Sequence, residues 1–155
     1  MANASLKAGW ACLTGLLLAA CASTRPTHHW WSTTGLASQD IERVIRDHPL
    51  ASDQNIRVVN LGVTDAVSHH VVQVRVAESF HVHAHHDLTV QVYRGHGQMR
   101  IGDREFPVQG GDVLFVPRGV PHAFRNGTAQ PAVALVIFNP AFDGKDTISL
   151  DDAQK

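Results

Sequence analysis

Short β-rich segments, separated by turn residues, fill most of the chain from residue 56 to residue 138. Turns are indicated by Gly95-His96-Gly97, Gly110-Gly111 and Asn126-Gly127. The spacing predicts eight strands, over residues 56–61, 71–76, 80–83, 88–94, 98–101, 112–116, 122–125 and 133–138. No helical period interrupts them, so the strands connect without crossover helices and the sheet is expected to be antiparallel. This pattern predicts an all-β sandwich or barrel in a single domain.

Histidine is the compositional outlier, with eleven residues, five of which lie between His81 and His96. Neutral imidazole is the commonest ligand for transition metals in proteins. His81 and His83 are two residues apart in a predicted strand, so both rings point to one side of the sheet. The preceding strand alternates apolar with polar residues, which favours an inward direction and a metal site. The alternative is a pair of solvated histidines on an outward face.

A third candidate ligand, His122, belongs to a motif of residues at fixed spacing: Gly111, Pro117, Gly119, His122 and Asn126. This set resembles the second motif of cupins at every named position, and His81, His83 and Gly95 resemble the first. The resemblance covers residues 56–140 and implies a double-stranded β-helix, the jelly-roll or cupin barrel. It also implies that His81, His83 and His122 bind one divalent transition metal, which could be Fe, Zn, Cu, Ni or Mn. The alternative for His122 is a core residue whose ring forms hydrogen bonds with the backbone and binds no metal.

The fourth ligand position of the family departs from the pattern. Seven residues before Gly95, where cupins usually have a glutamate, this chain has Leu88. A centre of three histidines would suit Zn, Cu, Ni or Fe(II) better than Mn. Alternatively His86, His85 or Asp87 replaces the glutamate, or Asp87 accepts a hydrogen bond from a ligand ring.

The pocket wall is expected to come from apolar residues of the strands around this site. Leu88 and Val90 alternate with polar residues and are assigned to the inner face, and Phe115 and Phe124 are assigned to the core or pocket wall. His69, His70 and His96 are expected at the surface. The tail at residues 139–144 is predicted to cross the barrel mouth or to serve a homodimer contact.

The first twenty residues read as a targeting segment. The apolar run at residues 8–20 follows a single charge at Lys7 and is too short to span a bilayer as a helix. The residues Leu18-Ala19-Ala20-Cys21 resemble a bacterial lipobox, which implies lipidation at Cys21. The expected protein is therefore anchored by lipid in the bacterial cell envelope, at the periplasmic side of the outer membrane. Ordinary secretion, to the periplasm or the medium, is the alternative.

Between the targeting segment and the barrel, residues 21–37 are predicted to be a tether and residues 38–55 a short helix with its connection. Ser38 is predicted to be the N-cap, and Pro49 follows the expected end of the helix. Ile41, Val44 and Ile45 share one face, which should cover part of the barrel at residues 56–150.

Composition excludes one class of function and leaves three. The formal net charge is −1, with no run of basic residues for nucleic-acid binding. The first hypothesis is a metal-dependent enzyme acting on a small molecule, of dioxygenase or isomerase type. The second is a small-ligand binding protein, and the third is a metal-sequestering protein that also uses His85, His86 and His96.

Overall fold

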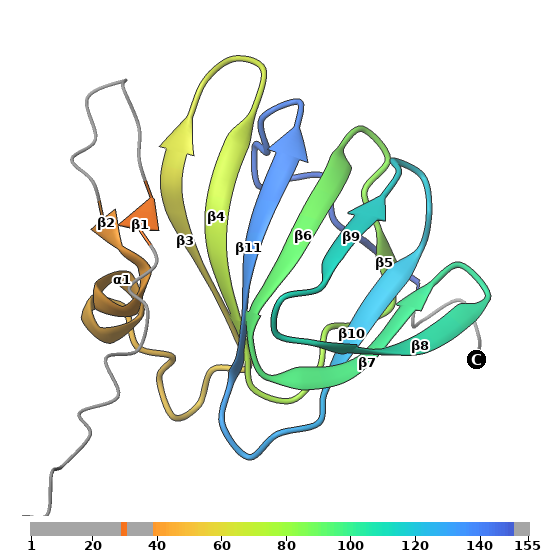
Figure 1. Cartoon of the computed structure of the whole chain (residues 1–155). Coiled ribbons are helices and arrows are strands. Elements are labelled where there is room, and N and C mark those ends of the chain that lie inside the picture. The colour runs from red at the N-terminus through yellow and green to blue at the C-terminus, as the bar shows by residue number, and fades with distance from the viewer. Residues whose placement is uncertain (1–28, 31–38, 151–155) are drawn as a thin grey trace, which may run out of the picture.

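The structure, a computed structural model, describes residues 29–30 and 39–150 and is built from two antiparallel five-stranded sheets (Figure 1). One sheet has the strand order β3-β4-β11-β6-β9, and the other has the order β12-β5-β10-β7-β8. Their strands are β3 (Ile56–Val63), β4 (Ser68–Val74), β5 (His81–Val82), β6 (Asp87–Arg94), β7 (His96–Ile101), β8 (Arg104–Gln109), β9 (Val113–Val116), β10 (His122–Asn126), β11 (Ala132–Asn139) and β12 (Ile148–Ser149). The prediction of an all-β jelly roll with a short N-terminal helix is confirmed.

Each of the eight predicted strands overlaps an observed strand, and the two five-stranded sheets contain two additional strands, β8 and β12. β8 contains charged residues and Pro107, which cannot donate a hydrogen bond to a neighbouring strand. Pro107 is tolerated because β8 is an edge strand that pairs only with β7. The strand predicted over residues 71–76 ends at Val74, and Val76 beyond it is 62% exposed.

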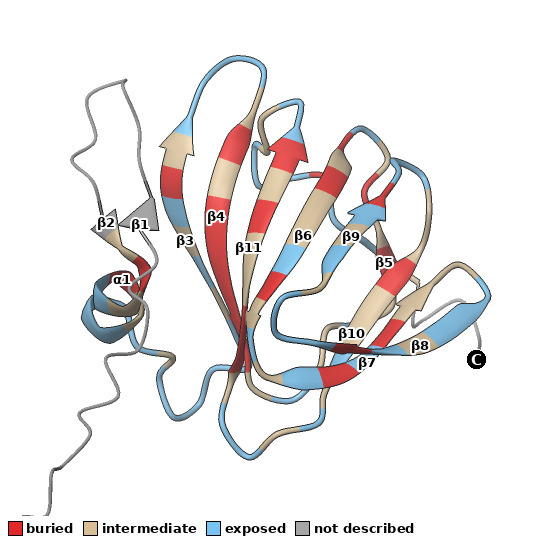
Figure 2. Ribbon diagram, in the orientation of Figure 1, coloured by how far each residue is buried: buried red, intermediate tan, exposed pale blue. Residues whose placement is uncertain are grey.

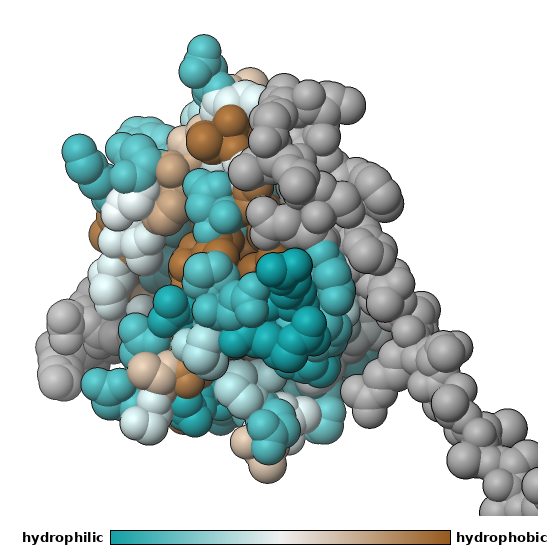
Figure 3. All heavy atoms as spheres, turned by 90° about the vertical axis from the view of Figure 1, so that its left-hand side faces the viewer, coloured by the Kyte–Doolittle hydropathy of each residue, from teal (hydrophilic) through white to brown (hydrophobic). Residues whose placement is uncertain are grey.

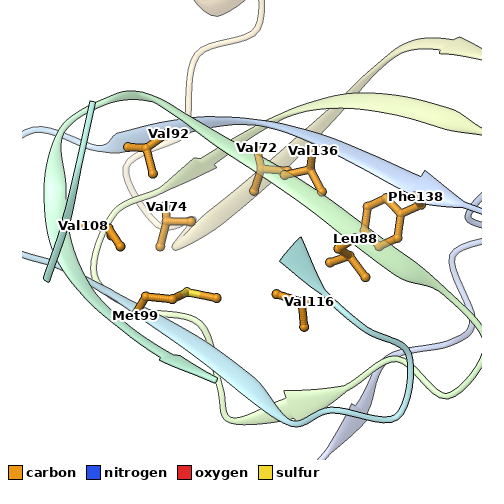
Figure 4. Close-up of a cluster of buried hydrophobic side chains, with 9 residues drawn as sticks. All are labelled: Val72, Val74, Leu88, Val92, Met99, Val108, Val116, Val136 and Phe138. Carbon is orange, nitrogen blue, oxygen red and sulfur yellow. The ribbon is translucent and has the colours of Figure 1, made fainter. Parts of the chain in front are cut away.

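The main core fills the space between the two sheets (Figure 4). Val72 and Val74 of β4 face Met99 of β7 across this space, with their side chains pointing inward. The remaining buried members of the cluster are Leu88, Val92, Val108, Val116, Val136 and Phe138. Alternation of buried and less buried residues along the strands is visible in Figure 2. The core therefore lies next to the ends of β5 and β10, where the histidines are placed.

A short helix, α1 (Ile41–Asp47), covers the outer face of the β3-β4 sheet. Ile41 and Val44 pack with Leu61, Val71 and Val133 in a second apolar cluster. The N-cap is Asp40, whose carboxylate accepts a hydrogen bond from the Glu42 backbone N–H at 3.0 Å. The predicted cap at Ser38 is therefore wrong by two residues, because the Asp40 side chain accepts the backbone N–H of Glu42 in the first turn.

Two further strands, β1 (His29–Trp30) and β2 (Gln39–Asp40), form a small antiparallel pair before α1. The predicted signal peptide, lipobox with Cys21 and most of the predicted tether lie outside the described residues. Within the described part, no helix is both long and apolar enough to cross a membrane.

Seen from the side of α1 and β3, hydrophobic residues reach the surface among hydrophilic ones (Figure 3). Three of the exposed residues, Ile56, Val58 and Val63, belong to β3.

Candidate metal centre

Three histidines converge inside the barrel at the end near β5 and β10. His81 lies in β5, His83 follows its last residue, and His122 begins β10. The two strands are antiparallel neighbours, and His122 is directly opposite His81. All three residues are buried, and one nitrogen from each ring lies within 4.8 Å of the other two. The strand period and the pairing of β5 with β10 thus bring three imidazoles together.

The hydrogen bonds of these rings determine which nitrogen is available to a metal. Nδ1 of His81 donates to the Ser79 carbonyl oxygen at 2.8 Å, and Nδ1 of His122 donates to the Val120 carbonyl oxygen at 3.1 Å. Nδ1 of His83 donates to the Asp146 carbonyl oxygen. Because a carbonyl oxygen only accepts, each Nδ1 carries the proton and each Nε2 keeps its lone pair. Such backbone contacts orient metal-ligating histidines and set their tautomer.

The electrostatic environment favours the neutral form of His122 and His83. The pKa of His122 is lowered to about 4, mainly by burial and also by nearby His81, while the hydrogen bond to Val120 opposes the shift. Burial also lowers the pKa of His83, against the raising effect of its bond to Asp146. A metal can bind imidazole only in the neutral form. Three buried imidazoles, each with Nδ1 bonded to a carbonyl oxygen, are a donor set that fits a divalent transition metal.

The structure does not bring His85, His86 or Asp87 to this cluster. His85 is exposed. His86 is buried but turned to other partners: its Nδ1 lies 2.6 Å from the Asp146 carboxylate and its Nε2 lies 3.2 Å from the Ala141 carbonyl oxygen. Both ring nitrogens thus face acceptors, and neither is left as a metal ligand in this arrangement.

Asp87 is bound to Arg118 instead of to a histidine. Its carboxylate accepts hydrogen bonds from the Arg118 backbone N–H at 2.8 Å and from the guanidinium group at 3.2 and 2.6 Å. These contacts with Arg118 lower the pKa of Asp87 to about 2. The proposed contact between Asp87 and a ligand ring is absent from the hydrogen bonds of the described residues, and Asp87 serves to join β6 to the turn before β10.

Asp146, which the sequence reasoning missed, organises the loop after His83. Its carboxylate accepts hydrogen bonds from the backbone N–H groups of Ala84 at 3.0 Å and His85 at 2.8 Å, in addition to the ring of His86. Burial alone would raise the pKa of Asp146, but these donors together lower it. The residue follows the last predicted strand by eight positions, and no sequence pattern connects it to the histidines.

An apolar cavity of about 220 Å³ opens beside the three histidines. Leu88, Val90 and Phe124 line it, whereas Phe115 does not. The assignment of Phe115 to the pocket wall is wrong: its side chain is 61% exposed on β9. The neighbours Leu114 and Val116 take the inner positions of that strand and pack in the core, which turns Phe115 outward. The cavity also contains Glu78, which the sequence reasoning did not single out.

The other histidines divide between surface and interior. His96 is exposed, as predicted, but His70 is 5% exposed and the prediction of a surface location is wrong. His70 has the same strand parity as inward-facing Val72, and its ring packs edge-on against Phe138 and Phe142. Its Nε2 lies 2.8 Å from the Ser68 hydroxyl group, which accepts the backbone N–H of Phe142 at 2.9 Å. This network attaches the C-terminal tail to β4.

Comparison with known proteins identifies the family. Residues 69–138 match the family model of the cupin domain. The chain is also 34% identical over 113 residues to an uncharacterized protein of Aquifex aeolicus, a match that covers 73% of this chain and 92% of that protein. The chain belongs to the cupin family.

Solved structures agree with this cupin fold. A crystal structure from Thermus thermophilus has a TM-score of 0.57 and 25% identity, and the match covers 67% of this chain and 97% of the other. An RmlC-like cupin from Shewanella frigidimarina has a TM-score of 0.52 and 20% identity, and the match covers 60% of this chain and 83% of the other. At that identity the second match supports the fold alone.

Within this cupin, the turn residues of the second motif support the barrel. Gly119 adopts a φ of 76°, a conformation that favours glycine, and its N–H donates to the His83 carbonyl oxygen at 2.7 Å. The Asn126 side chain donates to the carbonyl oxygens of Arg75 and Gln130, each at 2.9 Å. Gly119 and Asn126 of the motif therefore stabilise the backbone turns, whereas His122 faces the other two histidines. Leu88 is buried in the cavity wall where the family usually has its carboxylate.

Proposed function

We propose that this cupin binds one divalent transition metal through Nε2 of His81, His83 and His122 and acts on a small molecule in the adjacent cavity. One observation carries the proposal: three buried rings, each with Nδ1 bonded to a carbonyl oxygen, meet at the polar end of an apolar cavity. Buried imidazoles without a partner for Nε2 would lose hydration, and a metal ion compensates for that loss.

A site with three protein ligands leaves coordination positions for a substrate, which distinguishes catalytic from structural metal sites. A metal held there would supply Lewis acidity or, as iron, the capacity to activate dioxygen. The chain's own contribution is to hold the three rings in one tautomer and to surround the substrate with apolar side chains. This combination supports a metal-dependent enzyme of the dioxygenase or isomerase type.

Ligand binding without turnover is the second candidate. It is favoured by the lining of the cavity, in which apolar residues predominate and the three histidines and Glu78 are the titratable groups among the described residues. Metal sequestration has less support, because His85 and His96 are exposed and His86 faces Asp146 and Ala141.

Cobalt titration tests the metal site, because the visible spectrum of Co²⁺ reports its ligands. We expect one Co²⁺ per chain in the purified protein and loss of that spectrum on changing His81, His83 or His122 to Ala. His96→Ala is the matched control at an exposed histidine and should leave the spectrum unchanged. Binding that survives the loss of two of the three buried histidines would contradict the proposal. Small-molecule screening of the metal-loaded protein, for turnover and for a shift in melting temperature, then separates enzyme from binding protein.

Attachment to a membrane through Cys21 is a separate proposal, supported by the apolar run that ends in Leu18-Ala19-Ala20-Cys21. The lipid would place the cavity in the cell envelope. Cys21→Ser should release the chain from the membrane fraction after expression in a bacterial host with a lipoprotein pathway. Retention of the variant in that fraction would refute lipid anchoring at this residue.

A further inference from the structure

The cavity beside the histidines has a polar end and an apolar wall. The polar residues of its lining are the three histidines, Glu78, Ser79 and Thr147. The wall consists of aliphatic and aromatic side chains from both sheets, among them Val72, Leu88 and Phe138. Among the described residues, no lysine or arginine lines the cavity. Besides the histidines, Glu78 is the one ionisable residue of this lining.

Glu78 is held at this place by backbone contacts of its own and of the two residues before it. Its N–H donates to the Phe124 carbonyl oxygen at 2.8 Å, and the preceding residue, Ala77, forms an isolated β-bridge with Arg125. The Asn55 side chain accepts the N–H of Val76 at 2.9 Å. These bonds connect the segment before β5 to β10 and to the start of β3. The carboxyl group is therefore presented to the cavity from a fixed backbone.

The Glu78 side chain is half-buried and forms no hydrogen bond or ion pair with any residue in the described part of the chain. Burial raises the pKa of Glu78, and the neighbouring His81 lowers it by a smaller amount. A partly desolvated carboxyl group without a donor is unfavourable, and a ligand that brings a donor relieves that cost.

We infer that Glu78 and the apolar wall select one class of ligand: a mainly apolar small molecule with a hydroxyl group beside the oxygen atom that binds the metal. This inference rests on the proposed metal site and specifies its substrate class. The volume of about 220 Å³ limits the size of the ligand. An apolar cavity of roughly 150 Å³ holds benzene, so a ring with a short substituent fits.

Two phenyl ketones test this inference. 2-Hydroxy-1-phenylethanone has the hydroxyl group, and 2-methoxy-1-phenylethanone carries a methyl group in place of the hydrogen that the hydroxyl group donates. Each is titrated into the Co²⁺-loaded protein, and the change in the visible spectrum gives its Kd. We expect the hydroxy ketone to bind about 10-fold or more tightly than the methoxy ketone, as for a hydrogen bond to a carboxylate.

Variants of Glu78 test whether this residue causes the preference. Glu78→Ala should reduce the ratio of the two ketone Kd values to about 1, because the acceptor is gone. Glu78→Gln keeps an acceptor oxygen, so it should retain part of the ketone preference. Glu105→Ala is the matched control, since Glu105 is exposed on β8 and pairs with Arg125. It should leave both Kd values unchanged.

Two results would overturn the inference while the proposed metal site stands. One is equal binding of the hydroxy and methoxy ketones by protein with a normal Co²⁺ spectrum. The other is a ketone preference that persists in Glu78→Ala. Absence of a Co²⁺ spectrum that depends on the three histidines would instead refute the proposed function, and the inference with it.

Discussion

Replacement of Asp146 by Ala tests how the C-terminal tail supports the metal centre. The Asp146 carboxylate accepts three hydrogen bonds, from the backbone N–H groups of Ala84 and His85 and from the ring of His86. Its backbone carbonyl oxygen accepts the bond from Nδ1 of His83. Removing the carboxylate therefore loosens both the loop after β5 and the position of the acceptor that orients His83.

The expected loss of stability follows from the burial of these groups. A hydrogen bond to a charged acceptor contributes about 1.5–3 kcal/mol, and an unsatisfied buried donor costs about 1–3 kcal/mol. The exposed backbone of His85 can bond to water after the change, so its donor contributes little. We expect the free energy of unfolding to fall by about 3 kcal/mol, with the ring of His86 as the main cause. Metal affinity should fall roughly 10- to 100-fold, the range typical for lost support of a metal ligand.

Urea unfolding of the metal-free protein measures the first effect, and Co²⁺ titration measures the second. Asp143→Ala is a control in the same tail, because Asp143 is exposed and accepts a bond from the Lys145 backbone N–H. It should change stability by less than about 0.5 kcal/mol. An Asp146→Ala protein with the stability and Co²⁺ affinity of the unmodified chain would refute the role assigned to this residue.

Three other predictions address the cavity and its surroundings. The pKa of His122 falls from 6.5 in the unfolded chain to about 4 in the folded, metal-free protein. Between these pH values the unfolded chain binds one more proton than the folded protein, so the free energy of unfolding decreases as the pH falls. The stability of about 3 kcal/mol that His122 contributes is therefore present above pH 6.5 and lost toward pH 4. Urea unfolding across this range should show the slope, and His122→Gln should reduce it; an unchanged slope would contradict the assignment. Leu88→Glu should destabilise the metal-free protein, because it buries a carboxylate, and should increase Mn²⁺ affinity measured by electron paramagnetic resonance. Unchanged Mn²⁺ affinity would mean that this position does not reach the metal. Phe115→Ser should cost less than about 0.5 kcal/mol in urea unfolding, whereas a loss of about 3–5 kcal/mol would show that Phe115 is a core residue after all.

The local sequence patterns were sufficient for the barrel and for the three histidines. Alternating strands and glycine-rich turns predicted the eight strands, because each depends on neighbouring residues only. The His-x-His spacing placed His81 and His83 on one face for the same reason. The second motif added His122, although its position opposite His81 arises from the pairing of β5 with β10.

Errors arose where two faces of a strand were both apolar. β9 has the sequence Val113-Leu-Phe-Val116, in which alternation cannot distinguish the inner from the outer face. Pairing with β6 and packing in the core determine that Leu114 and Val116 point inward, so Phe115 is exposed. His70 was misplaced for a related reason: the strand was expected to begin at residue 71, so its inward parity was not extended back to residues 68 and 70.

The sequence by itself therefore determined an all-β fold through its local periodicity, and its resemblance to the cupin motifs implied the barrel and the three candidate ligands. Only the tertiary structure decided the surroundings of the site. Asp146 reaches the loop at residues 84–86 from about sixty positions away. Glu78 enters the cavity because its segment bonds to β10, and Asp87 is held by Arg118. Such contacts depend on how distant strands pack, and a one-dimensional pattern does not contain that information.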